Sequence, residues 1–250
     1  NDDLANATQA WGSNFTAIGY NVGASGETGE ADPYGFLYAD GSRLGTRRSV
    51  WWKWTPPVSG VYNIETYGSD LYTHLSIHTG ASALSSWLWR DVSDLDPLNY
   101  LVTGKKDELD RRRRGTRTTS YEFNAGVTYY FRVGGGDYNG DHAGTIRLEV
   151  SGPPAIPPTP LGFNGTRSGQ TVVVLSWQDL SQDETGYEIQ RSTDGSTWTP
   201  VATLQAHPDN SVDFGAPAAD LTYRLRATNT LGNSDWATDF VAIPAPPAAP

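Results

Sequence analysis

The chain is predicted to fold from β-strands. Short segments rich in Val, Tyr, Thr and Trp alternate with turns of Gly, Asn, Asp and Pro along its whole length. Few stretches carry the 3.6-residue apolar repeat of a helix. A third observation concerns the proline-rich run at 153–160, which interrupts regular structure because proline fixes φ and removes a backbone donor. We therefore expect two all-β modules joined by a linker.

The chain is long enough for two domains that each have a sizeable core. It has 250 residues, of which 37% are hydrophobic and 18% are charged. We expect a first domain at 1–152, a proline-rich linker at 153–160, a second domain at 161–243 and a proline-rich tail at 244–250. By composition the linker is extended and semi-rigid, so it should separate two modules.

Composition narrows the classes of function. The 28 acidic and 18 basic residues give a net charge of −10, which argues against a nucleic-acid binder because phosphate binding needs a basic face. The absence of cysteine excludes a disulfide framework and a thiolate metal site. There is no apolar run of about 18 residues, so no membrane span is expected. We expect a monomeric fragment of a longer protein.

The first domain contains an unusual strand, SVWWKW, which ends at two prolines. Successive side chains of a strand point to opposite faces. Val50, Trp52 and Trp54 therefore share one face, and Trp51 and Lys53 share the other. One of these faces must be buried, and the pattern alone does not decide which.

Several segments of the first domain follow one another in an order known from a protein family. They are 1–7, 23–30, 49–62, 75–80, 123–134 and 138–148. In that order they resemble the bacterial pre-peptidase C-terminal (PPC) domain, a jelly-roll-like β-sandwich appended to secreted hydrolases, over nearly all of residues 1–150. The resemblance implies that Trp51 packs in the core, which leaves Trp52 as the ring that we expect to be exposed.

The second domain alternates strongly between apolar and polar residues. The expected strands are 171–177, 186–192 and 221–229. The segments 175–177, 184–195, 223–229 and 232–234 resemble the bacterial fibronectin type III domain. This resemblance covers about 155–243 and implies an immunoglobulin-like sandwich of about seven strands, with Trp177 and Tyr223 in its core. In secreted bacterial enzymes such domains are mostly spacers.

A set of carboxylates near one edge of the first sandwich predicts a calcium site, because Ca²⁺ takes about six to eight oxygen ligands. The set comprises Asp2, Glu27, Glu30 and Asp32. Collagen-binding relatives of the PPC domain hold calcium with an Asn-Asp pair at this end, and Asn1 and Asp2 match that pair. We expect Ca²⁺ as the cofactor, and solvated loop carboxylates are the alternative.

The segment 85–117 is longer than the matching part of the PPC domain, and it combines aromatic with basic residues. Together with Trp52 of the tryptophan strand, this segment supplies the candidate ligand-binding residues, which are Trp52, Trp87, Trp89, Tyr100, Arg111, Arg112, Arg113 and Arg114. Guanidinium groups bind carboxylate or sulfate groups through two hydrogen bonds, and neighbouring rings can stack on sugar faces. Such a site would favour an anionic polysaccharide. The alternative is a solvated loop in which the acidic residues of 107–110 pair with the arginines.

No catalytic motif is present in the sequence. It contains neither a Gly-x-Ser-x-Gly elbow nor a His-Glu-x-x-His motif, and no pattern marks an acid and base pair. His74 and His78 would lie about 13 Å apart on a strand, which is too far for one metal ion. We expect both histidines on the solvent face. We assign no catalytic residue and do not expect an enzyme.

These observations favour a non-catalytic ancillary fragment of a secreted bacterial enzyme that acts on polysaccharide. The first domain would bind carbohydrate, and the second would space it from neighbouring domains of the same polypeptide, outside the cell or on its surface. The alternative is a structural or protein-binding module, which would pack on a neighbouring catalytic domain or bind a protein such as collagen. An exposed aromatic row would favour sugar, and a flat polar face would favour protein.

Overall fold

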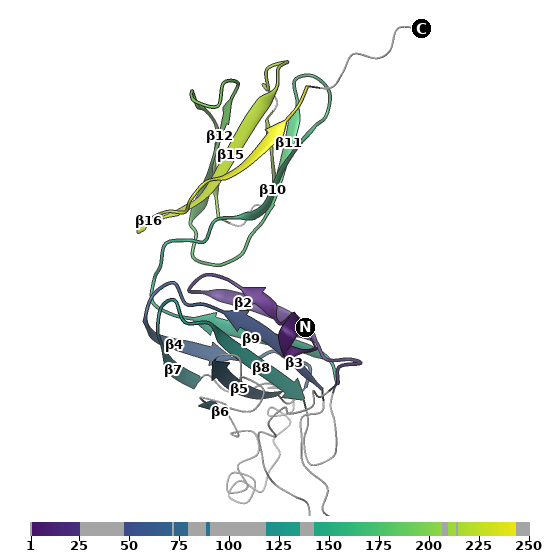
Figure 1. The fold of residues 1–250 in the computed structure, drawn as a ribbon, viewed down its shortest axis with the longest axis vertical. Coiled ribbons are helices and arrows are strands. Elements are labelled where there is room, and N and C mark those ends of the chain that lie inside the picture. Colours follow the sequence, from purple (N-terminus) through teal and green to yellow (C-terminus); the bar gives the residue numbers. More distant parts are fainter. Residues whose placement is uncertain are drawn as a thin grey trace, which may run out of the picture. The chain divides into compact units, whose positions relative to one another are not determined.

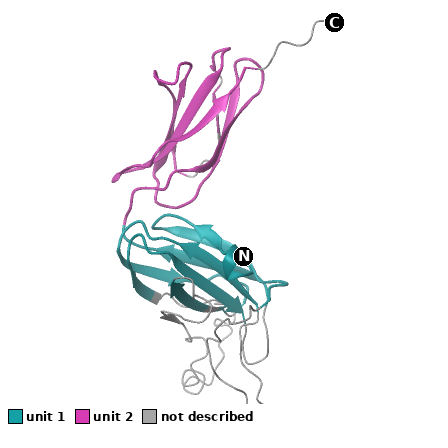
Figure 2. Cartoon of the chain, viewed as in Figure 1, with its two compact units in different colours: residues 1–153 teal, residues 154–250 magenta. Residues whose placement is uncertain are grey.

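The computed structural model describes residues 2–25, 48–71, 73–79, 89–90, 119–135, 143–206, 210–213 and 215–243. The chain forms two compact units, residues 1–153 and 154–250 (Figure 2), and strands build both of them. The all-β prediction is therefore confirmed. The boundary between the units falls within the proline-rich run. The described residues contain no helix with the length and apolar character that a membrane span requires.

The first unit is a sandwich of two sheets. Its elements are η1 (Leu4–Asn6), β1 (Thr8–Ala10), β2 (Phe15–Tyr20), β3 (Ser49–Trp54), β4 (Gly60–Glu65), β5 (Thr73–Thr79), β6 (Trp89–Arg90), β7 (Thr119–Phe123), β8 (Tyr129–Gly135) and β9 (Thr145–Ser151). One sheet has the order β1-β3-β8-β5-β6 and the other has the order β2-β9-β4-β7 (Figure 1). Buried residues of both sheets form a single core.

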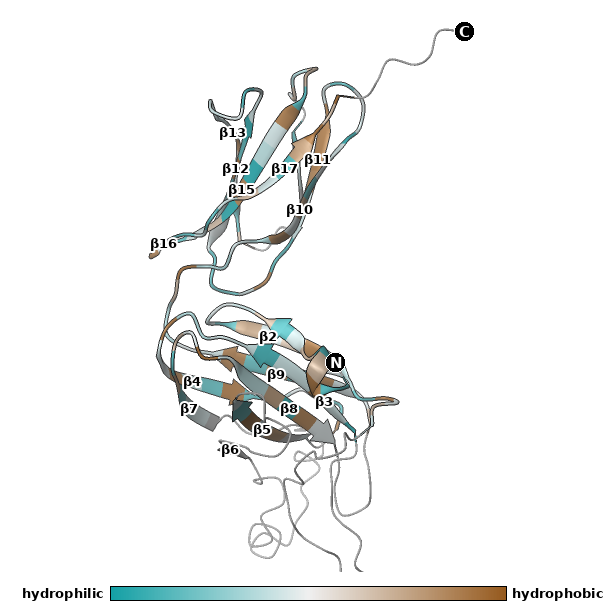
Figure 3. Ribbon diagram, in the orientation of Figure 1, coloured by the Kyte–Doolittle hydropathy of each residue, from teal (hydrophilic) through white to brown (hydrophobic). Residues whose placement is uncertain are grey.

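Alternating side chains explain why these strands pair as they do. In β9, Ile146, Leu148 and Val150 are buried, whereas the residues between them are partly exposed. Figure 3 shows the hydropathy of the strands, and hydrophobic and hydrophilic segments follow one another along them. The same alternation fixes which side of β2 faces the core, because β2 and β9 are antiparallel with Phe15 opposite Val150. A shift of one residue would turn every apolar side chain to the wrong face, so the register is specified strongly.

Trp54 lies at the centre of an aromatic cluster in this core. Its ring centroid is 4.9 Å from that of Tyr62, 5.2 Å from that of Phe123 and 5.9 Å from that of Phe15. Its indole N–H donates a hydrogen bond of 2.8 Å to the carbonyl oxygen of Gly12. Edge-to-face ring contacts and a satisfied indole donor are both favourable inside a core.

The expectation that Trp52 is exposed is wrong. Its side chain is 0% exposed, because Gly19 on the opposite sheet leaves room for the ring. A Cβ at Gly19 would lie 2.6 Å from Cζ2 of Trp52. Trp51 is also buried, as expected, and its ring centroid lies 5.2 Å from that of His78. Strand β3 is therefore buried on both faces, and its tryptophans offer no surface to a ligand.

The second unit is also a sandwich of two sheets. Its strands are β10 (Leu161–Arg167), β11 (Val173–Gln178), β12 (Gly186–Ser192), β13 (Thr199–Gln205), β14 (Asn210–Asp213), β15 (Leu221–Asn229), β16 (Gly232–Asn233) and β17 (Ala237–Val241). One sheet has the order β10-β11-β14, and the other has the order β13-β12-β15 with β16 and β17 both paired to β15. This is the arrangement of an immunoglobulin-like sandwich. Trp177 and Tyr223 lie in its core, as expected.

The first residues of the second unit belong to its fold. Ala155 is buried, and its carbonyl oxygen accepts a hydrogen bond of 2.7 Å from the side-chain amide of Asn229. The same amide donates a bond of 2.9 Å to the carbonyl oxygen of Asp183. This part of the proline-rich run is therefore held against the second unit before β10 begins.

Candidate functional site

One of the four carboxylates predicted to hold calcium lies in the described part of the chain. Oδ1 of Asp2 accepts a hydrogen bond of 2.8 Å from the backbone N–H of Ser25, and its Oδ2 accepts one of 3.3 Å from the Ser25 hydroxyl. Glu27, Glu30 and Asp32 lie outside the described residues. Within the described ranges, no three His, Cys, Asp or Glu side chains gather closely enough to hold a metal ion.

Most of the predicted glycan site also lies outside the described residues. These positions are Trp87, Tyr100, Arg111, Arg112, Arg113 and Arg114. The backbone of Trp89 belongs to β6, where it pairs with Ile77 of β5 at the edge of the sheet. Trp52 is buried. The structure therefore does not bring the predicted glycan-binding side chains together within its described part.

His78 is buried, contrary to the expectation that it faces solvent. Its Nε2 lies 2.8 Å from Oγ of Ser76 on the same strand, and its ring lies beside Trp51. The side chain of His74 lies outside what the structure describes. Ser76 and His78 are both buried, in the sheet that also contains β3, so the pair is not an open catalytic site.

A different surface lies on the outer face of the sheet β2-β9-β4-β7. Side chains alternate along each strand, so the residues between core positions point outward. The residues of interest on the strands are Ile18 and Tyr20 of β2, Arg147 and Glu149 of β9, and Glu65 of β4. Exposed Tyr67, in the turn after β4, joins them because its carbonyl oxygen accepts a hydrogen bond from Arg147. We refer to these residues as the Arg147 face.

Arg147 lies at the centre of this face and contacts groups on two strands. One guanidinium nitrogen is ion-paired with Glu149, and the other lies 3.9 Å from Oε1 of Glu65 and donates a hydrogen bond of 3.3 Å to the carbonyl oxygen of Tyr67. The three charged side chains are each about a third exposed, so solvent screens their attraction and they add little stability. The charged cluster is therefore within reach of a ligand from solvent.

Two exposed tyrosine rings border the central strand of this face. Tyr20 is 66% exposed and Tyr67 is 50% exposed. Tyr20 ends β2 and Tyr67 follows the end of β4, and these two strands lie on opposite sides of β9 (Figure 1). The turn that carries Tyr67 is fixed by Ser69. The Ser69 hydroxyl donates a bond of 2.7 Å to the carbonyl oxygen of Thr66 and accepts one of 3.0 Å from the backbone N–H of Arg147.

Sequence reasoning missed the Arg147 face, although one signal was present. In FTAIGY of β2, buried Phe15 fixes the outward positions, and two of these hold the large residues Ile18 and Tyr20. A large apolar side chain at a solvent-facing position is a mark of a binding surface when it has exposed neighbours. The neighbours, Arg147 and Tyr67, come from distant parts of the sequence, so no local pattern joins them.

The larger sheet of the second unit carries a stack of alternating arginine and tryptophan side chains on its outer face. Cζ of Arg224 lies 3.9 Å from the ring centroid of Trp198 and 4.2 Å from that of Trp236. Cζ of Arg226 lies 4.4 Å from Trp236, and Arg226 is ion-paired with Glu188 at 2.6 Å. Burial, followed by repulsion from Arg226, lowers the pKa of Arg224. We refer to Trp198, Arg224, Trp236 and Arg226 as the arginine–tryptophan stack.

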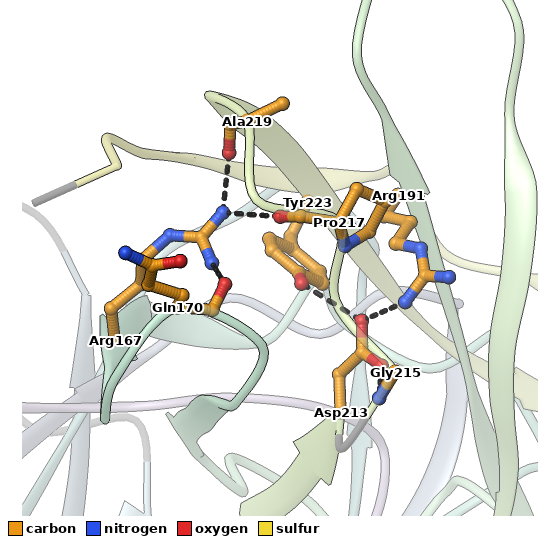
Figure 4. A network of polar contacts seen from close by, with 8 residues as sticks. All are labelled: Arg167, Gln170, Arg191, Asp213, Gly215, Pro217, Ala219 and Tyr223. Carbon is orange, nitrogen blue, oxygen red and sulfur yellow. Dashed lines mark hydrogen bonds and ion pairs between the residues drawn. The ribbon is translucent and has the colours of Figure 1, made fainter.

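A polar network joins the two sheets of the second unit (Figure 4). Asp213 accepts a hydrogen bond of 2.9 Å from the Tyr223 hydroxyl and one of 3.0 Å from the backbone N–H of Gly215, and it is ion-paired with Arg191. Nearby, Arg167 donates hydrogen bonds to backbone carbonyl oxygens. These belong to Gln170, Pro217 and Ala219. All these partners belong to the unit itself, which identifies the network as a part of the fold.

The comparisons with known proteins concern part of the chain. No protein-family model matches it, and no curated protein matches it either. Similar solved structures are fibronectin type III domains. FN3tt mut is 24% identical over 36% of this chain and 98% of its own, with a TM-score of 0.32. An Fn3-like protein from Clostridium thermocellum is 23% identical over 36% of this chain and 97% of its own, with a TM-score of 0.31. The fn3 domain of the human collagen alpha-1(XX) chain is 13% identical over 40% of this chain and 99% of its own, with a TM-score of 0.32.

Proposed function

We propose that this chain is a non-catalytic ancillary fragment of a secreted bacterial protein that acts on polysaccharide. The first unit, which resembles the PPC domain, binds carbohydrate, and the second is a spacer toward neighbouring domains. The observation that supports this proposal is the Arg147 face, where two exposed tyrosine rings border an arginine flanked by two carboxylates. An exposed aromatic surface favours sugar over a protein partner.

The chemistry of this face suits a sugar ring. A tyrosine side chain combines a flat apolar ring with a hydroxyl group, so it can pack on the C–H face of a sugar while its edge remains hydrated. It has few rotatable bonds, so little conformational entropy is lost on binding. The carboxylates of Glu65 and Glu149 accept hydrogen bonds from sugar hydroxyls, and Arg147 donates them.

A spacer role for the second unit is supported by the way its polar groups are used. Asp213 is bonded to Tyr223 and Arg191 inside the unit, and the arginine–tryptophan stack pairs its cations with its own rings. These contacts stiffen a small sandwich. A stiff module is suited to holding a binding domain apart from its neighbours.

Calcium is a finer part of the proposal. The Asp2 carboxylate is bonded to Ser25, two residues before Glu27, which supports a site formed with Glu27, Glu30 and Asp32. A ligand that binds the native state alone raises its stability. Melting temperatures in EDTA and in millimolar Ca²⁺ test this point, and equal values would remove the site.

Screening the 250-residue chain against a glycan array tests the proposed function. Binding to a polysaccharide should fall at least about tenfold in a Tyr20→Ala/Tyr67→Ala variant, because most binding energy of a small interface rests on a few aromatic contacts. The matched control is Phe240→Ala, which removes an exposed ring from the second unit. Wild-type chain that binds no glycan would support a structural or protein-binding module instead.

A further inference from the structure

The Arg147 face has an excess of negative charge. Arg147 is the only cation in strands β2, β9, β4 and β7. Glu65 and Glu149 flank it. Within the Arg147 face the formal balance is therefore one positive charge against two negative charges.

Both terminal nitrogens of Arg147 already lie beside a carboxylate. Glu149 is ion-paired with one terminal nitrogen, and the carbonyl oxygen of Tyr67 and the carboxylate of Glu65 share the other. An acidic sugar that approached Arg147 would therefore lie beside both carboxylates. Like charges placed together oppose binding, so the face selects against uronate and sulfate groups.

Uncharged hydroxyl groups match the same arrangement well. A hydroxyl donates one hydrogen bond and accepts others, so it can donate to Glu65 or Glu149 while it accepts from Arg147. Hydrogen bonds with one charged partner are stronger than those between neutral groups. A neutral sugar therefore gains from this face without bringing a charge of the wrong sign.

Resting on the proposed function, we infer that the Arg147 face binds a neutral polysaccharide and rejects acidic ones. Tyr20 and Tyr67 supply the ring contacts, and the Glu65, Arg147 and Glu149 cluster supplies the discrimination. This specificity is separate from the acidic-glycan site predicted at Arg111–Arg114 and is opposite in sign to it.

Affinity electrophoresis of the 250-residue chain tests the inference with matched probes. Each pair has a common backbone: hydroxyethyl cellulose with carboxymethyl cellulose, dextran with dextran sulfate, and fully methyl-esterified with de-esterified pectin. The neutral member of at least one pair should be bound at least about tenfold more tightly than its acidic partner. Glu65→Gln/Glu149→Gln should reduce that preference, and an unchanged melting temperature should show that the fold is intact.

Salt separates the two origins of charge selectivity. If carboxylates repel the acidic probe, raising the ionic strength should strengthen the weak binding of that probe. If an arginine cluster attracts it, raising the ionic strength should weaken its binding. Preference for an acidic member that is lost both at high salt and in Tyr20→Ala/Tyr67→Ala would overturn the inference and leave the proposed function intact. Equal affinity for both members of every pair would also overturn it. Binding to none of the six probes would count against both, since the neutral backbones would then find no site.

Discussion

The hydroxyl of Tyr223 donates a hydrogen bond of 2.9 Å to Oδ2 of Asp213, so β15 of one sheet is tied to β14 of the other. Both residues are buried, and Arg191 of β12 is ion-paired with the same carboxylate. A buried charge destabilises a fold unless it is paired and hydrogen-bonded. The three side chains therefore depend on one another.

Removing the Tyr223 hydroxyl should weaken the second unit. Tyr223→Phe is expected to lower the free energy of unfolding by about 1.5–3 kcal/mol, which is typical of a hydrogen bond to a charged group. Asp213→Ala should lower it further, because the Arg191 guanidinium then loses its carboxylate. Urea unfolding measures both variants, with Tyr20→Phe as the exposed control. A Tyr223→Phe variant as stable as the wild type would show that the bond adds nothing.

The same tyrosine should make the stability of the second unit fall at alkaline pH. Burial, followed by the bond to Asp213, raises the pKa of Tyr223, and burial likewise raises the pKa of Tyr187. The folded chain then keeps protons that the unfolded chain has lost. This stabilisation is fully present below the ordinary tyrosine pKa of about 10 and is lost as the pH rises above it. Urea midpoints measured from about pH 8 to about pH 11 should fall only above about pH 9.5, and less steeply in Tyr223→Phe.

The second unit was predictable from sequence because its signals are local. The strands expected at 186–192 and 221–229 are found as β12 and β15. From Leu221 to Thr228 of β15, buried and partly exposed residues alternate, so the period of two is visible in the sequence alone. Trp177 and Tyr223 occupy buried positions of this pattern and lie in the core.

The first unit was harder to predict because its decisive contacts join distant segments. The burial of Trp52 depends on the absence of a side chain at Gly19, in the opposite sheet. The Arg147 face arises because β2 pairs with β9, which places residues from the two ends of the unit side by side. An alternating strand pattern gives two faces, and it does not say which one another element covers.

The contact between Trp52 and Gly19 can be tested from both sides. Trp52→Ala should destabilise the first unit by about 3–5 kcal/mol, as expected for a large aromatic residue removed from a core. Gly19→Ala should also destabilise it, by about 1–3 kcal/mol, because the new methyl group overlaps the ring. Trp11→Ala is the control, since its ring is 38% exposed. Thermal melting that leaves Gly19→Ala at the wild-type value would contradict this packing.

The arginine–tryptophan stack should stabilise the second unit through cation–π contacts. Such contacts contribute about 0.5–1 kcal/mol at exposed sites and about 2 kcal/mol when water is excluded. The guanidinium of Arg224 lies between two rings, and the Arg224 side chain is partly buried. Its coupling to Trp236 should therefore lie between these values.

A double-mutant cycle with Arg224→Met, Trp236→Ala and the combined variant measures that coupling as the part of the loss that is not additive. Methionine keeps an unbranched apolar stem while it removes the charge, so the cycle reports the cation and not the loss of packing along the stem. We expect a coupling of about 1 kcal/mol that persists at high salt, because a partly buried contact is screened little. Strict additivity of the two changes would mean that the rings and the guanidinium are merely adjacent.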